Sequence, residues 1–143
     1  MRRLVMGWVL ATISTAALAG ETGKIEVRVD AIRNNDGQVF VSLFNKAEGF
    51  PGGAEAAIQT LSAKQSDGQA TVTFVDVPYG DYAIAAYHDE DGNGKMKTVY
   101  GTIPVEGIGI SRDAKGIMGP PKFADAKFAL NSAAITVAVS IKY

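Results

Sequence analysis

The residues best suited to chemistry lie in one short segment, residues 88–95. Asp89, Asp91 and Asn93 carry oxygen-bearing side chains at alternate positions, and a glycine follows them. This order matches the first half of the calcium-loop pattern D-x-[DN]-x-[DN]-G. Calcium takes about six to eight oxygen ligands, and one turning loop can supply several of them. The spacing therefore predicts a calcium site made by the side chains of Asp89, Asp91 and Asn93 and by the backbone carbonyl of Lys95.

The second half of the segment departs from an EF-hand. Lys97 and Tyr100 stand at positions nine and twelve of the pattern, where an EF-hand has a bidentate Glu at the twelfth. We therefore expect a weaker site that is completed by an acid from elsewhere, and Glu106, Asp113 and Asp125 are the candidates. The alternative interpretation is a polar turn in which Asp, Asn and Gly serve only the backbone.

A catalytic role would depend on His88, the only histidine of the chain. A Ser-His-Asp arrangement would combine it with Asp89 and with Ser111 as the nucleophile. However, the residues around Ser111 lack the second glycine of the G-x-S-x-G nucleophile elbow. One histidine and no cysteine also make a zinc site a poor fit. We therefore predict that the protein is not an enzyme, and a hydrolase using His88 is the weakest alternative.

The first 19 residues resemble a secretory signal peptide. A short basic start at Arg2 and Arg3 precedes an apolar run from Leu4 to Ala17, and Ala17-Leu18-Ala19 is an A-x-A cleavage signature. The apolar run is too short to span a bilayer as a helix. The sequence therefore predicts export to the periplasm or beyond, with one domain over residues 20–143 and no membrane span in it.

Charge and composition narrow the possible partners. Without Arg2 and Arg3, the chain from Gly20 carries 12 basic and 15 acidic residues, a net charge of −3. No basic patch is present, so nucleic acid is not an expected partner. There is no cysteine, so the domain must be held by its core or by a metal. We expect a monomer whose partner or ligand is unknown.

Alternating apolar residues predict a β-sandwich. Residues 25–29 and 135–141 alternate strictly, and residues 39–44, 71–77 and 82–87 also read as strands. Asn34-Asn35-Asp36-Gly37 is a hairpin signal, which predicts that the first two strands pair antiparallel. Residues 54–57 predict at most a turn of helix before a strand over residues 58–64. The pattern favours an all-β, antiparallel sandwich of about seven strands with Greek-key connections.

Two segments, residues 82–87 and 106–131, indicate how further parts of the chain cover the expected sandwich. Small residues on one face of strand 82–87, at Ala83 and Ala85, should allow another layer to approach closely, while Ile84 should face Val137 across the core. Residues 106–131 are rich in glycine and proline but contain large apolar residues, among them Ile108, Ile110, Ile117, Met118, Phe123 and Phe128. We expect them to form one long irregular loop over an end of the sandwich.

Two resemblances support the fold. The segment Val77-Pro78-Tyr79-Gly80-Asp81-Tyr82-Ala83 resembles the P-x-G-x-Y corner of prealbumin-like and collagen-adhesin B-type sandwiches. Four motifs in order resemble the exported bacterial family known as domain of unknown function 2141 (DUF2141). These motifs are Gly80-Asp81-Tyr82-Ala83, residues 88–95, residues 101–111 and Gly119-Pro120-Pro121-Lys122-Phe123-Ala124-Asp125-Ala126.

The family resemblance implies a secreted, mostly β domain without an established activity. The chain departs from the family pattern at Lys97, where the family commonly has an acid, and at Arg112, where Asn is common. Lys97 would repel a cation. We therefore expect an exported, non-enzymatic module with a weak calcium loop. The alternative is a structural or stress-protective envelope protein without a ligand.

Overall fold

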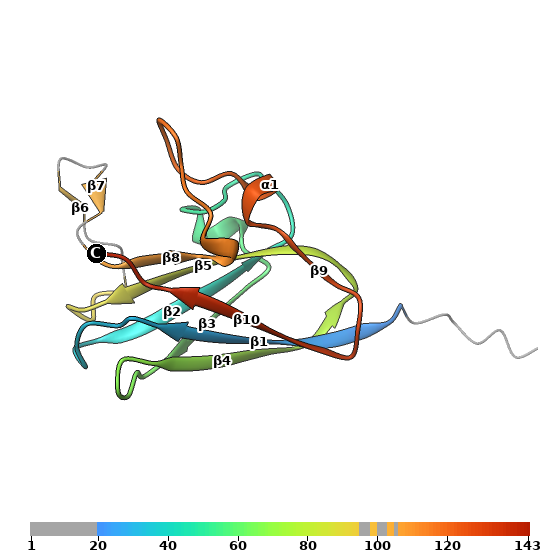
Figure 1. Cartoon of the computed structure of the whole chain (residues 1–143), viewed down its shortest axis with the longest axis horizontal. Helices are drawn as coiled ribbons and strands as arrows, with labels where there is room; N and C mark the ends of the chain where they lie inside the picture. Colours follow the sequence, from blue (N-terminus) through green and yellow to red (C-terminus); the bar gives the residue numbers. More distant parts are fainter. Residues whose placement is uncertain (1–19, 95–97, 100–102, 105) are drawn as a thin grey trace, which may run out of the picture.

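Two β-sheets pack face to face, as the computed structural model of the chain shows (Figure 1). The structure describes residues 20–94, 98–99, 103–104 and 106–143. The expected signal peptide lies outside the described residues, and so do Lys95 and Lys97. The expectation of an all-β sandwich is confirmed.

The smaller sheet has three strands in the order β10-β1-β4. The strands are β1 (Thr22–Asp30), β4 (Ala70–Pro78) and β10 (Ala134–Ser140). β4 runs antiparallel to β1, but β10 runs parallel to it, with Val27 opposite Val137. The sequence predicts a wholly antiparallel sandwich, and the parallel pairing of β10 with β1 shows that this part of the prediction is wrong.

The larger sheet has five strands and is centred on β5 (Gly80–Asp89). Its order is β3-β2-β5-β8, and β9 pairs with the start of β5. The bounds are β2 (Gln38–Phe44), β3 (Gln59–Ala63), β8 (Ile108–Ile110) and β9 (Phe128–Leu130). A separate ribbon is formed by β6 (Thr98–Val99) and β7 (Ile103–Pro104).

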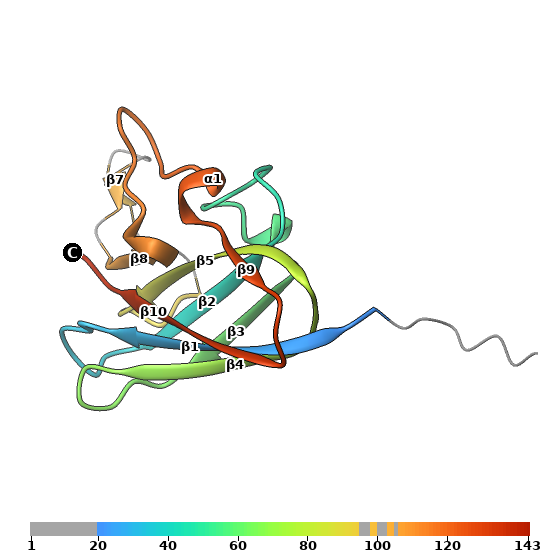
Figure 2. The same ribbon diagram turned by 45° about the vertical axis from the view of Figure 1, so that its right-hand side comes forward.

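The predicted pairing of the first two strands is wrong. β1 and β2 lie in different sheets, and the turn at residues 34–37 carries the chain from one sheet to the other (Figure 2). β2 pairs instead with β3 and β5, with Val41 opposite both Leu61 and Ala86. A turn signal specifies a local reversal of the chain, whereas the choice of sheet depends on partners that are distant in sequence.

The main core fills the space between the sheets. Val39, Val41 and Leu43 of β2 are fully buried in it, as their alternation predicts, and Ile84 of β5 is 0% exposed. Val137 packs against the same core from the opposite sheet but is only half-buried. Ile84 is therefore placed as expected. Val137 is less enclosed because β10 lies at an edge of its sheet.

A second, smaller cluster covers the outer face of β5. Ala83 and Ala85 point into it and meet Phe50, Ile110 and Phe123. The prediction that small residues on this face admit another layer is confirmed. The layer consists of the loop carrying η1 (Ala54–Ala56) and of the segment holding η2 (Ser111–Asp113) and α1 (Phe123–Ala126).

Residues 106–131 are more ordered than the expected irregular loop. They contain β8, η2, α1 and β9, and their chain wraps over the outer face of the larger sheet (Figure 1). Within the described residues, no helix is long and apolar enough to cross a membrane.

Candidate metal centre

The candidate site begins at the last residue of β5. Asp89 is fully buried and lies opposite Gln38 of β2 in the sheet register. The turn before β2 presses against it, because a Cβ added at Gly37 would lie 1.6 Å from the Asp89 carbonyl oxygen. Gly37 also has a φ of +61°, which glycine adopts readily. The sheet and this turn together hold the Asp89 backbone in place.

Three acidic side chains converge at this end of β5. Carboxylate oxygens of Asp89, Asp91 and Glu106 all lie within 4.8 Å of one another. Asp89 and Glu106 are buried, at 0% and 4% exposed, whereas Asp91 is open to solvent. Glu106 is brought here by the segment entering β8, whose Gly107 carbonyl accepts a hydrogen bond of 2.9 Å from the His88 amide.

The Asp89 carboxylate is only partly satisfied. Its Oδ2 accepts a 2.8 Å hydrogen bond from the Gly94 amide. Its Oδ1 is buried and has no hydrogen-bond partner among the described residues. A buried carboxylate oxygen is costly unless it is hydrogen-bonded, paired or bound to a metal. A buried carboxylate oxygen without a partner, on a side chain that lies beside two further acids, therefore suits a cation ligand.

Tyr87 shapes the loop around the acids. Its hydroxyl donates a 3.1 Å hydrogen bond to the Gly94 carbonyl, and its ring stacks on Phe40 with centroids 5.1 Å apart. Burial raises the pKa of the Tyr87 hydroxyl, and the negative charges of Asp89 and Glu106 raise it further. The phenol therefore lies within the negative field of the acids, and it ties the loop closed as a neutral donor.

Among the described residues, the Arg33 guanidinium is paired with Glu90, which lies next to Asp89 in the sequence. Arg33 forms a 2.5 Å ion pair with Glu90, and Asn34 donates to the same carboxylate at 3.0 Å. Burial raises the pKa of the Glu90 carboxyl, but the hydrogen bonds from Asn34 and Arg33 and the charge of Arg33 outweigh this and leave it lowered. Arg33 thus pairs with Glu90, which is not one of the three acids of the cluster.

The sequence-predicted ligands are only partly brought together. Asp89 and Asp91 lie in the cluster, and Glu106 is the acid from elsewhere. Asn93 is exposed, and its amide donates to the Asp91 Oδ1 at 3.2 Å. Lys95 lies outside the described residues.

The other two candidate acids are not part of the cluster. Asp113 is ion-paired with Lys142, and Asp125 lies exposed on α1. The sequence offered Glu106 as one of three choices, but it contained no sign of the Tyr87 hydrogen bond to Gly94.

His88 and Ser111 have structural partners. The His88 Nδ1 lies 2.7 Å from the Tyr143 hydroxyl, and its Nε2 lies 2.7 Å from the Asp36 carbonyl. The Ser111 Oγ accepts a 2.9 Å hydrogen bond from the Ile84 amide and donates one of 2.7 Å to the Ala126 carbonyl. Both side chains are 0% exposed.

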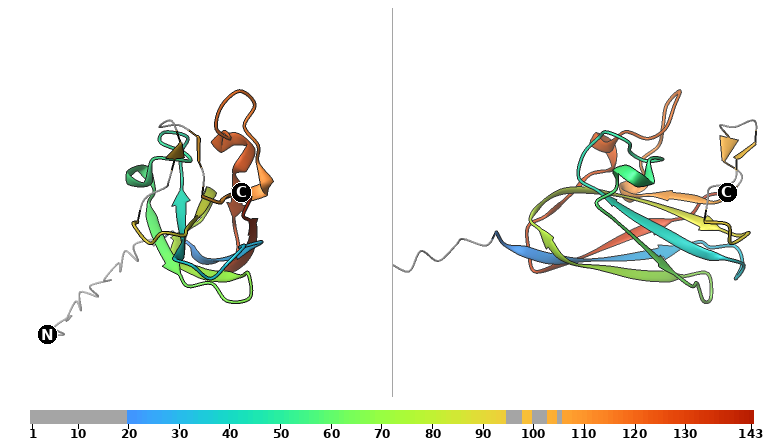
Figure 3. Two further views of the ribbon diagram at one scale, coloured as in Figure 1. Left: turned by 90° about the vertical axis from the view of Figure 1, so that its left-hand side faces the viewer. Right: turned by 180° about the vertical axis from the view of Figure 1, so that it is seen from behind.

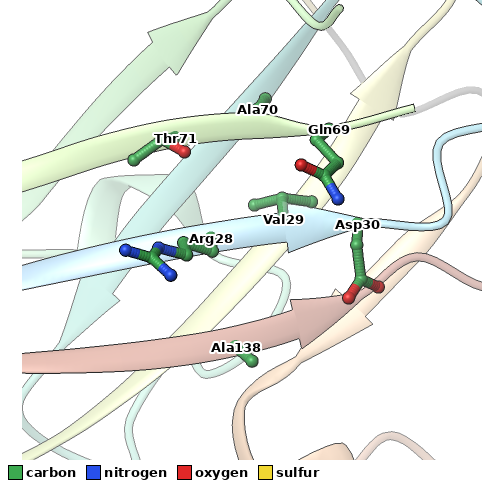
Figure 4. Close-up of a pocket in the computed structure, with 7 residues that line it drawn as sticks. All are labelled: Arg28, Val29, Asp30, Gln69, Ala70, Thr71 and Ala138. Carbon is green, nitrogen blue, oxygen red and sulfur yellow. The ribbon is translucent and has the colours of Figure 1, made fainter. Parts of the chain in front are cut away.

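A hollow on the smaller sheet is a weaker candidate, because its described lining residues do not form a cluster of acids like that of Asp89, Asp91 and Glu106. It measures about 310 Å³ and lies over Arg28 and Asp30 of β1, between Thr71 and Ala138 (Figure 4). The Arg28 Nε is paired with Glu26 at 2.7 Å, and the Asp30 carboxylate accepts from Ser140 at 2.5 Å. Its charged groups are thus satisfied by neighbours, which leaves the acidic cluster as the better candidate.

The sequence was compared with family models, with curated proteins and with solved structures, and one family model matches it. No match was found among the curated proteins or the solved structures with which the chain was compared. A family model described as an uncharacterized protein conserved in bacteria matches residues 27–138, which is most of the chain and includes the whole acidic cluster. The chain therefore belongs to the bacterial family DUF2141.

Proposed function

We propose that the protein is an exported, non-enzymatic β-sandwich module that binds one calcium ion weakly through Asp89, Asp91 and Glu106. The loop after β5 supplies two of the ligands, and the segment entering β8 supplies the third. The ion would thereby join two parts of the chain that are separated by the β6–β7 ribbon.

The buried Oδ1 of Asp89 carries this proposal. It has no hydrogen-bond partner among the residues that the structure describes, and a carboxylate oxygen of Asp89 lies within 4.8 Å of oxygens from two other acids. Like charges brought so close repel one another, and burial weakens the screening of that repulsion by water. A bound cation would replace this repulsion with attraction.

The donor set favours calcium over other cations. All three side chains offer carboxylate oxygen, the hard ligand that calcium and magnesium prefer, and neither sulfur nor imidazole is present in the cluster. The exposed loop around Asp91 can adapt to the irregular coordination of calcium, whereas magnesium requires near-octahedral geometry. With three acids, we expect a dissociation constant on the order of 10⁻⁴–10⁻³ M.

A hydrolase using His88 has less support. Both ring nitrogens of His88 are hydrogen-bonded, and within the described residues no hydrogen bond joins His88 to Ser111. An envelope protein with no ligand would leave the Asp89 Oδ1 buried without a hydrogen-bond partner among the described residues. Export rests on residues 1–19, and N-terminal sequencing of protein from the cell envelope should begin near Gly20.

Calorimetric titration combined with thermal melts tests the site. Calcium that binds the folded form should raise the melting temperature as its concentration rises. Glu106→Gln keeps the shape of the side chain and removes its charge. This variant should lose the calcium-dependent increase in melting temperature.

Asp125→Asn provides the matched control. Asp125 is an exposed acid outside the cluster, so this variant should keep the full calcium response. If millimolar calcium produces neither heat nor a change in the wild-type melting curve, the acids do not form a calcium site and the proposal is wrong.

A further inference from the structure

The segment between η2 and α1 stands away from both sheets. Residues 114–122 form a loop before α1 that projects away from the strands in every view (Figures 1, 2 and 3). The acidic cluster has no part in it. The loop therefore needs an explanation of its own.

The base of the loop is firmly anchored. Ser111 at one end accepts a hydrogen bond from β5 at Ile84 and donates one to Ala126 at the other end. Phe123 packs edge-on against Phe50, with ring centroids 6.0 Å apart. The segments on either side of the loop are therefore tied to each other and to the larger sheet.

A tight turn forms the tip. A Cβ added at Gly116 would lie 1.6 Å from the Gly119 carbonyl oxygen, so the two ends of the turn pass too closely for a side chain there. Met118 has a φ of +57°, a conformation that residues other than glycine rarely adopt and that costs free energy. This geometry directs two apolar side chains outward: Ile117 is 91% exposed and Met118 is 104% exposed.

Cationic side chains flank the apolar tip. Lys115 and Lys122 are exposed on either side of the turn, and neither forms an ion pair within the described residues. Asp113 nearby is paired with Lys142. The tip thus combines apolar side chains at its apex with positive charge behind them.

From this arrangement we infer that the turn at residues 116–119 inserts into the surface of an anionic lipid bilayer. Ile117 and Met118 would enter the boundary between headgroups and acyl chains, and Lys115 and Lys122 would contact the anionic headgroups. A stable protein interface buries about 800 Å² on each partner, far more than two side chains on a convex tip can offer. A lipid surface needs no complementary pocket.

Vesicle binding tests this inference. The chain from Gly20, which contains both hydrophobic clusters, is mixed with vesicles of phosphatidylcholine alone or with phosphatidylglycerol. We expect sedimentation with the anionic vesicles. The double variant Ile117→Ser, Met118→Ser should lower the apparent partition coefficient by about tenfold or more. Lys115→Gln with Lys122→Gln should remove the preference for anionic lipid.

A fluorescent reporter and matched controls make the result specific. The only tryptophan is Trp8, so Met118→Trp places a single tryptophan at the tip of the chain from Gly20. Its emission should shift to the blue with anionic vesicles, whereas Val75→Trp, at a half-exposed position on β4, should not shift. Ile58→Ser, at an apolar residue that is 47% exposed elsewhere, should bind like the wild type.

Three results would overturn the inference. The wild type could fail to bind at millimolar lipid, the serine variant could bind equally well, or the tip could instead form a dimer that the serine variant abolishes in gel filtration. Running each assay in calcium and in chelator separates this inference from the calcium proposal, because the tip residues are not part of the acidic cluster.

Discussion

The Tyr143 hydroxyl lies 2.7 Å from the Nδ1 of His88, whose side chain is fully buried. The Asp36 carbonyl can only accept a hydrogen bond, so the His88 Nε2 donates to it, and in the neutral ring the Nδ1 accepts from Tyr143. The Tyr143 oxygen in turn accepts from the Arg33 amide at 3.1 Å, and the Arg33 guanidinium lies 4.2 Å from the centre of the Tyr143 ring. These contacts fasten the segment after β10 to the turn before β2.

Tyr143→Phe should weaken the fold measurably. The substitution keeps the ring but leaves the buried Nδ1 of His88 without its donor, which should lower the free energy of unfolding by about 1–3 kcal/mol. Denaturant melts measure the loss. Tyr79→Phe is the control, because the Tyr79 hydroxyl makes no hydrogen bond to the described residues, and its effect should stay within about 0.5 kcal/mol.

Ile84→Ala should be among the most destabilising single changes in the core. Ile84 is 0% exposed between the sheets, so truncation removes contacts and leaves a cavity, at a cost of about 2–5 kcal/mol. Val137→Ala should cost less, because Val137 is only half-buried and loses fewer atoms. Ile58→Ala, at an exposed position, serves as the reference. Equal melting midpoints for Ile84→Ala and Ile58→Ala would contradict the placement of Ile84.

Tyr87→Phe should weaken calcium binding without unfolding the protein. The phenylalanine ring can still stack on Phe40, but the hydrogen bond that holds the Gly94 carbonyl is lost. A looser loop should raise the calcium dissociation constant by about fivefold, as expected for a hydrogen bond of about 1 kcal/mol. Calorimetric titration measures the change, and Tyr79→Phe should leave the constant unaltered.

The ion pair between Asp113 and Lys142 predicts a specific acid response. The hydrogen bond and charge of Lys142 lower the pKa of the Asp113 carboxyl below 3.8, although some desolvation opposes this. A group whose pKa is lower in the folded state stabilises the fold above its unfolded pKa, and this contribution is lost as the pH falls through the folded value. Carboxyl NMR titration should therefore place Asp113 below 3.8.

Lys142→Gln tests whether Lys142 is the cause of the lowered Asp113 pKa. It should return the Asp113 pKa toward 3.8 and shift the loss of this contribution to correspondingly higher pH. An unchanged Asp113 titration in this variant would show that Lys142 is not responsible for the lowered value.

The strand pattern could be predicted because it is local. Apolar residues alternate along β1, β2, β5 and β10 because one face of each strand is buried. This periodicity can be read from residues that are neighbours in the sequence. The small face of β5 at Ala83 and Ala85 likewise predicted a second layer. The family motifs between residues 80 and 126 could also be recognised from the sequence, because each is a contiguous stretch. They fall within the region that the family model matches.

The tertiary structure alone decided which strands meet and which acids converge. The parallel pairing of β1 with β10 and the separation of β1 from β2 depend on how distant strands share one core, and a hairpin signal says nothing about that choice. Asp89 and Asp91 were predictable from their spacing. Glu106 was selected over Asp113 and Asp125 because the chain entering β8 returns beside β5, whereas Asp113 lies against Lys142 and Asp125 on α1. Burial of the Asp89 carboxylate likewise follows from packing around the end of β5, which no local pattern encodes.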